Sequence, residues 1–164
     1  ARNFEKQVRE QPLIVKTALG RTAEFLMGLI KQRTARGMSA DGNSFPPYTE
    51  AYKTFRQQAG RQTQYPDLNF SGQMLSNITQ RSQPTQAIIY FANKFQNVKA
   101  LGNQKKRKFF AIGQREQIPI INKFMQEFKN NSFYFTNKNM WFILDKYCNF
   151  LSTKDNEILK KLTL

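Results

Sequence analysis

Four consecutive basic residues form the densest chemical feature of the sequence: Lys105, Lys106, Arg107 and Lys108. They lie within a stretch from Leu68 to Arg115 that holds eight basic residues and no acidic one. A surface of this kind suits phosphates or an acidic protein, and its phosphate contacts would not depend on base sequence. The run is therefore a candidate surface for nucleic acid or an acidic partner protein, and a solvated basic loop is the alternative.

Catalytic chemistry has few residues to draw on in this chain. Histidine, the commonest general base and metal ligand, is absent from the sequence. The eleven acidic residues are scattered, with no DxD or ExxE pair, and the glycines fit no phosphate-binding loop. The single cysteine, Cys148, allows neither an intrachain disulfide nor a CxxC zinc site, and we interpret it as a core residue. We therefore expect a protein that is not an enzyme and that uses no cofactor or metal.

Length and charge bound the class of protein. The chain has 164 residues, of which 40% are apolar, enough for one domain with a core that needs no disulfide. The formal net charge of +15 indicates an anionic partner and says little about the fold. No apolar run approaches the roughly 18 residues that span a membrane, and the first residues do not form a signal peptide. We expect no membrane partner and folding in a cytoplasm, with Ala1 following a removed methionine.

Helices are predicted from apolar spacing and capping residues. A long N-terminal helix is expected from Leu13 to about Arg36, with Pro12 in its first turn and Gly37 after its end. Thr49 is expected to cap a second helix, and short helices are expected over 71–76 and 93–101. A further helix over 118–130 is expected to bury one face, made of Ile118, Ile121, Met125 and Phe128.

Strands are predicted where β-branched and aromatic residues gather. Residues 77–83 and 86–92 are expected to form a hairpin, and Lys105 to Ile112 a further strand. The predicted fold class is α+β: a small antiparallel sheet of three to five strands with the N-terminal helix and the 118–130 helix packed on it. The composition changes near Asn131, so we interpret 1–130 as one α+β domain and 131–164 as a C-terminal extension. The alternative is that 131–164 is the last element of the same core.

The segment from Thr34 to Ile78 carries a family resemblance. A D-G … F-x-P-Y-T … Y … G pattern is followed by L-N-F-S-G-Q-M-L-S-N-I, and looser counterparts follow at 92–102 and 107–110. The matching residues are Asp41, Gly42, Phe45, Pro47, Tyr48, Tyr52, Gly60, Leu68, Ser71, Gly72, Met74, Leu75 and Ile78. In their order the chain resembles the virion morphogenesis, or tail-completion, proteins of tailed bacteriophages over about residues 12–130. The segment after Asn131 and the strong positive charge lie outside the pattern.

The resemblance implies a structural role in a virion, with assembly in the cytoplasm of a bacterial host. Copies of the chain would form a homomeric ring of six at the head–tail (neck) junction. This ring would join a portal or head-completion protein to a tail tube or tail terminator protein, and packaged DNA would pass through it with non-specific contacts. The loops over 37–48 and 60–67 would order on neighbouring rings. The alternative is a basic nucleic-acid-binding protein that acts outside the virion.

Overall fold

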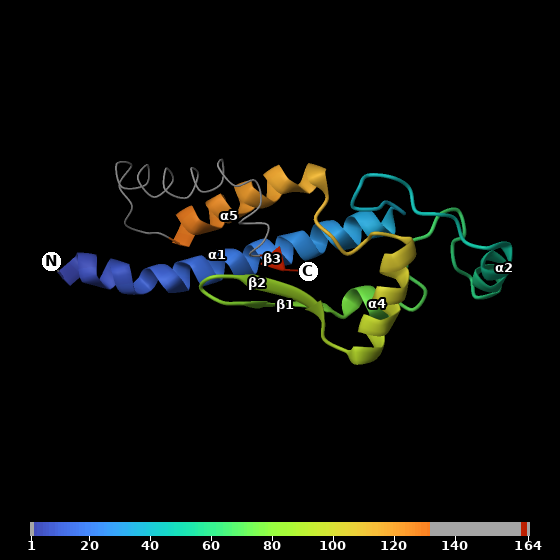
Figure 1. The fold of residues 1–164 in the computed structure, drawn as a ribbon, viewed down its shortest axis with the longest axis horizontal. Helices are drawn as coiled ribbons and strands as arrows, with labels where there is room; N and C mark the ends of the chain where they lie inside the picture. The colour runs from blue at the N-terminus through green and yellow to red at the C-terminus, as the bar shows by residue number, and fades with distance from the viewer. Residues whose placement is uncertain (1, 132–161, 164) are drawn as a thin grey trace. The chain divides into compact units, whose positions relative to one another are not determined.

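The computed structural model of the chain describes residues 2–131 and 162–163 (Figure 1). The described residues form a long N-terminal helix, further helices and a small sheet, so the predicted α+β class is confirmed. They divide into two compact units: residues 2–25, 80–89, 118–131 and 162–163 form unit 1, and residues 26–79 and 90–117 form unit 2. The predicted extension over 131–164, with Cys148, lies almost entirely outside the described residues.

Helix α1 spans Arg2–Ala35 and buries the apolar stripe that the sequence predicts. Leu19, Leu26 and Ile30 are at most 2% exposed, and Gly37 follows the helix with a φ of +72°. The helix starts earlier than predicted, so Pro12 lies inside it rather than in its first turn. Residues 2–11 contain Arg, Glu, Lys and Gln, which are good helix formers but give no apolar stripe, so periodicity alone underestimates the helix.

The predicted hairpin is confirmed as β1 (Ile78–Ser82) and β2 (Ala87–Phe91), joined by a turn that the Gln83 amide closes onto the Gln86 carbonyl at 2.7 Å. A two-residue strand, β3 (Leu162–Thr163), pairs in parallel with β2 and completes the sheet order β1-β2-β3. In unit 1, the hairpin comes close to α1 at Gly20, where a Cβ would lie 3.0 Å from Ser82 Oγ. Glycine at this position therefore lets strand and helix pack closely.

Helix α5 (Gln117–Asn131) belongs to unit 1 and buries a different face from the one predicted. Ile120, Phe124 and Glu127 are its buried residues, whereas Ile118 is 70% exposed. The predicted face was wrong because periodicity gives no weight to a buried acid. The Glu127 carboxylate is paired with Arg21 of α1 at 3.5 Å and with Lys123 at 2.7 Å, and these pairs make its burial possible.

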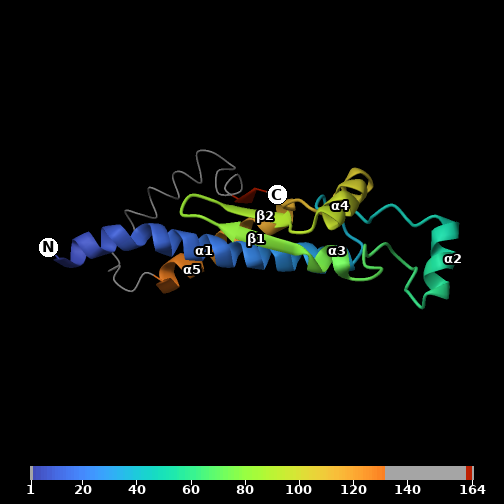
Figure 2. The same ribbon diagram turned by 90° about the horizontal axis from the view of Figure 1, so that it is seen from below.

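Unit 2 contains three further helices: α2 (Glu50–Gln58), α3 (Gln73–Ser76) and α4 (Lys94–Lys106). Thr49 caps α2 as predicted, and Asn93 caps α4 by accepting hydrogen bonds from two backbone amides. Helix α3 packs against α4 (Figure 2). Within 2–131, no helix combines the length and the apolar character that a membrane span requires.

The strand predicted over Lys105 to Ile112 is wrong. Helix α4 continues to Lys106, and the chain then runs as a loop to the short 3-10 helix η1 (Gln114–Glu116). Arg33 of α1 donates to the Phe109 carbonyl at 2.6 Å and the Ala111 carbonyl at 2.9 Å. These carbonyls are therefore satisfied by a side chain instead of a neighbouring strand. Arg33 also pairs with Glu116, so it fixes this loop at two points.

Candidate functional site

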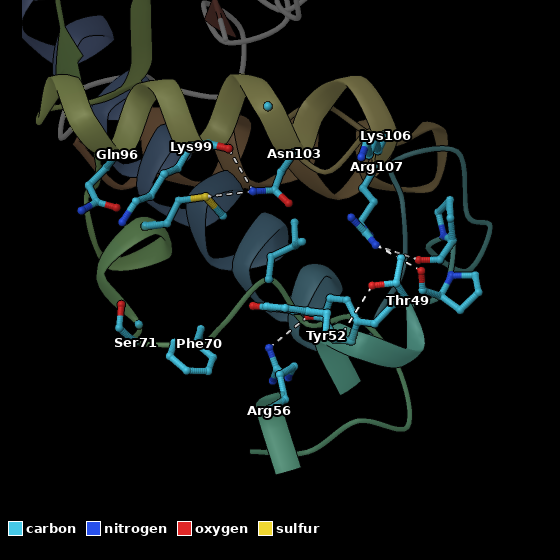
Figure 3. A pocket seen from close by; sticks show the side chains of 17 residues that line it. Thr49, Tyr52, Arg56, Phe70, Ser71, Gln96, Lys99, Asn103, Lys106 and Arg107 are labelled. Atoms are coloured by element: carbon cyan, nitrogen blue, oxygen red, sulfur yellow. Dashed lines mark hydrogen bonds between the residues drawn. The ribbon is translucent and has the colours of Figure 1, made fainter. Parts of the chain in front are cut away.

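A pocket of about 750 Å³ lies within unit 2 (Figure 3). Residues from α2, α4 and the segments 46–49 and 68–74 line it, and in Figure 3 the side chains of Lys99, on α4, and Arg107, which follows α4, extend to the side on which Tyr52 and Phe70 lie. Four of the lining residues are basic and none is acidic: Arg56, Lys99, Lys106 and Arg107. The pocket therefore presents positive charge without a carboxylate of its own.

The residues that carry the family resemblance gather around this pocket. Seven of them line it: Pro47, Tyr48, Tyr52, Leu68, Ser71, Gly72 and Met74. Gly42, Gly60 and Gly72 adopt φ values of +83°, +65° and +80°, which side chains with a Cβ rarely allow. Leu68 also has a positive φ, +52°, although it is not a glycine. The sequence pattern thus corresponds to a set of backbone turns and the walls that they build.

Stacked aromatic rings form one side of the site. The rings of Tyr48 and Tyr52 meet edge to face at 4.9 Å, and those of Phe55 and Phe70 stack at 5.2 Å with planes 16° apart. The sequence favours core packing over base stacking for Tyr48, Tyr52 and Phe55. Tyr48 is 8% exposed, which agrees with core packing, and Tyr52 is partly buried, but Phe55 is 51% exposed. Phe55 packs on a loop residue, and that arrangement leaves half of it open to solvent.

Arg56 is a buried cation that the sequence analysis missed. It is 1% exposed, and each of its guanidinium nitrogens donates a hydrogen bond. Nε donates to the Gln62 carbonyl at 2.8 Å, Nη1 to the Tyr48 hydroxyl at 3.1 Å, and Nη2 to both Asp67 oxygens at 3.1 and 3.2 Å. Its charge is therefore balanced inside the protein, and Arg56 joins α2 to the loop that leads to Asp67.

Tyr48 takes part in the same network through its hydroxyl. The hydroxyl donates to Asp67 Oδ1 at 3.2 Å and accepts from the Asp67 backbone amide at 3.2 Å. Burial, together with the nearby Asp67 carboxylate, raises the pKa of Tyr48 above its usual value, and the Arg56 charge opposes this shift. The phenol keeps its proton over a wide pH range and serves as a fixed link in the network.

The second half of the predicted basic run is tied to the loop over 37–48. Arg107, the residue that ends α4, donates from Nη2 to the carbonyls of Pro46 and Pro47 at 3.0 and 3.4 Å. Lys108 pairs with Asp41 at 2.9 Å, and both side chains are more than half exposed. These two residues hold a loop in place.

The first half of the run lies on the last turn of α4, where Lys105 and Lys106 are exposed. Among residues 12–131, whose side chains are described, neither has an ion-pair partner, and the same holds for Lys99. The structure therefore does not present Lys105 to Lys108 as one continuous surface. Lys106 and Lys99 instead both line the pocket. This placement depends on the helical geometry of α4, and the strand predicted from Lys105 did not allow for it.

Helix α4 also exposes apolar side chains. Phe95, Val98 and Leu101 are 76%, 62% and 58% exposed, and their spacing of three residues places them on one face of the helix. Exposed apolar residues that occur singly need no explanation, but a group on one helix face indicates an interaction site. The short helix expected over 93–101 carried no prediction of which face would be exposed, so this face was not identified from the sequence.

The chemistry that this site offers is binding to anionic and apolar groups. Its lining provides ammonium groups, aromatic rings and short polar side chains. In the part of the chain that the structure describes, no three His, Cys, Asp or Glu side chains gather where they could hold a metal ion. Compared with known proteins, the chain matches no protein-family model, no curated protein and no solved structure.

Proposed function

We propose that the chain is a non-enzymatic structural protein of a tailed-bacteriophage particle, part of a ring at the head–tail junction. The observation that carries this proposal is the outer face of α4, which combines exposed Phe95, Val98 and Leu101 with lysines and no acid. A helix face of this composition suits contact with another protein. It belongs to the same unit as the residues that resemble tail-completion proteins, so the sequence pattern and the exposed surface support one role.

The proposed assembly is a ring of six copies with heterologous contacts between neighbours. One side would meet the portal or head-completion protein and the other the tail tube or tail terminator protein. The loop over 37–48 is already held by Arg107 and Lys108, so we place a partner contact on α4 instead of this loop. The lysines of α4 would in addition allow weak, sequence-independent contact with DNA that passes through the ring.

Electron microscopy of particles that carry the chain tests this proposal. Several copies should form a closed ring at the head–tail junction, identified by fitting the two units separately into the map. A particle with a single copy, or infectious particles that lack the chain, would contradict the proposed role.

DNA binding at several salt concentrations separates this role from that of a free nucleic-acid-binding protein. A free binder that neutralises many phosphates loses about a thousandfold or more in affinity between low and physiological salt. A ring component should bind DNA weakly already at low salt, because only a few lysines on α4 would contact phosphates. Tight, steeply salt-dependent binding to duplex DNA would favour the nucleic-acid-binding alternative.

A further inference from the structure

We propose that the pocket of unit 2 and the outer face of α4 together bind an extended acidic segment of a partner protein, and that this segment also carries apolar side chains. The inference rests on the proposed function in one respect only, that the partner is a protein. It adds the chemistry by which that partner is recognised and the two lysines, Lys99 and Lys106, that select it.

Only some of the positive charges at the pocket are available to a partner. The charge of Arg56 is balanced by Asp67, and Arg107 donates to two carbonyls of the protein itself. Lys99 and Lys106 are exposed, line the pocket and form no ion pair with any of residues 12–131, whose side chains the structure describes. They are seven positions apart, which is about two helical turns or about 10 Å along the axis. Their ammonium groups can therefore meet two carboxylates spaced along one extended segment.

The charge of α4 indicates that the partner is acidic. Helix α4 carries four lysines and no acidic residue: Lys94, Lys99, Lys105 and Lys106. Two copies of this face would repel one another, so it does not suit a symmetric contact between identical helices. An acidic partner gains from the same charges that would oppose self-association. Charge complementarity therefore selects an acidic segment over a second copy of α4.

The exposed apolar residues of α4 favour a protein partner over a nucleic acid. Phe95, Val98 and Leu101 lie beside the lysines on α4 and are each more than half exposed. Single-stranded nucleic acids cover aromatic rings by base stacking, but phosphates and sugars gain little from contact with Val98 and Leu101. Apolar side chains of a protein bury such a surface favourably. The combination of lysines with aliphatic side chains thus favours a protein segment.

The pocket is large enough to hold a side chain of the partner segment. A volume of about 750 Å³ exceeds what a single carboxylate fills and lies within the range of pockets that bind ligands. Tyr52, Phe70 and Leu68 contribute apolar surface to the lining, and Figure 3 shows Tyr52 and Phe70 across the pocket from α4. An apolar side chain can fill this interior while neighbouring carboxylates reach Lys99 and Lys106. An extended segment with alternating acidic and apolar residues meets all of these requirements.

Selection from a library of random peptides on the purified full-length chain tests the proposal. We expect the enriched peptides to be acidic and to carry aromatic or aliphatic residues. The dissociation constant of a synthetic copy of the best peptide should rise about tenfold or more in the double variant Lys99→Glu/Lys106→Glu, because two attractions become repulsions. Val98→Asp should weaken binding as well. Each variant should melt at the temperature of the parent protein, since these side chains are exposed.

The matched control is the double variant Lys16→Glu/Lys129→Glu, which makes the same charge change at exposed positions of unit 1. It should leave the dissociation constant close to that of the parent. An equal loss in the control would show that the peptide responds only to net charge, which would overturn the proposal. No enrichment, or enrichment of peptides without acidic residues, would overturn it too.

Fluorescein-labelled single-stranded DNA provides the competing probe. If the chain binds this DNA more tightly than any selected peptide, and Lys99→Glu/Lys106→Glu abolishes that binding, the surface recognises nucleic acid and the proposal fails. Failure of the proposed function is a separate result. Absence of the chain from phage particles, with specific binding of acidic peptides retained, would remove the virion role and leave the docking surface in place.

Discussion

Two walls of one pocket use positive charge in opposite ways. On the wall from α2, Arg56 is buried and all of its nitrogens donate to groups of the protein. On the wall from α4, Lys99 and Lys106 are exposed and form no ion pair with the side chains of residues 12–131. A formal charge of +15 therefore overstates what is available to a partner, because part of it is balanced inside the fold. The charges that can bind a partner are those of exposed side chains without an ion-pair partner in the fold.

Replacing Arg56 by Met should have the largest effect on the stability of the protein. The substitution removes the partner of Asp67 and leaves a carboxylate without compensation in a nearly buried position, so the free energy of unfolding should fall by about 3–5 kcal/mol. Urea denaturation followed by circular dichroism measures this loss. Arg36→Met is the matched control, because Arg36 is exposed, and it should cost no more than about 0.5 kcal/mol. Equal effects in the two variants would show that the Arg56 network adds little stability.

Replacing Tyr48 by Phe tests the same network through its hydroxyl. Near neutral pH the free energy of unfolding should fall by about 1–3 kcal/mol, since Asp67 and Arg56 each lose a hydrogen-bond partner. The raised pKa of Tyr48 in the native state gives this loss a pH dependence. The protonated phenol contributes stability fully below the unfolded pKa of about 10 and loses that contribution as pH rises through the higher native pKa.

The difference between the parent protein and Tyr48→Phe should therefore shrink above pH about 10, where an unfolded tyrosine releases its proton. Urea denaturation of both proteins, near neutral pH and again in this alkaline range, measures the difference directly. Subtraction removes the contribution of the other tyrosines and the lysines, which titrate in both proteins. A difference that stays constant with pH would show that the hydroxyl has the same pKa in the folded and unfolded states.

Neutralising the two halves of the basic run separately should have a smaller effect on stability. Arg107→Gln/Lys108→Gln removes the contacts to Pro46, Pro47 and Asp41 and should lower the free energy of unfolding by about 1–2 kcal/mol. The control, Lys105→Gln/Lys106→Gln, removes the same charge from exposed side chains and should change it by less than about 0.5 kcal/mol. Only the charges of Lys105 and Lys106 are thus expected to be dispensable for folding. Equal stabilities would show that the loop contacts are dispensable.

The elements that sequence analysis predicted well are those with local causes. The stripe of α1, the cap at Thr49, the hairpin and the turn at Gly37 each follow from the residues of one short segment. The errors have tertiary causes. Residues 107–112 contain aromatic residues typical of a strand, but Arg33 of a distant helix occupies their carbonyls. The buried face of α5 contains Glu127, whose burial depends on a cation from α1.

The candidate site was predicted only in part. Composition drew attention to the basic run, and two of its members, Lys106 and Arg107, do line the pocket. Lys99 and Arg56 were not singled out because isolated basic residues in a strongly basic chain carry no distinguishing pattern. What separates them is burial and pairing, one fully compensated and the other exposed. Those properties arise only when α2, α4 and the intervening loop are brought together.

Leu68 gives the pocket wall an energetic bias of its own. With a φ of +52° it occupies a backbone conformation that costs an ordinary residue about 1–2 kcal/mol and that glycine adopts freely. Glycine there would relieve the backbone but remove a side chain from the pocket wall. The protein thus keeps a leucine at a position where backbone preference alone would choose glycine. At this residue, folding stability and the shape of the binding surface make opposite demands on the same amino acid.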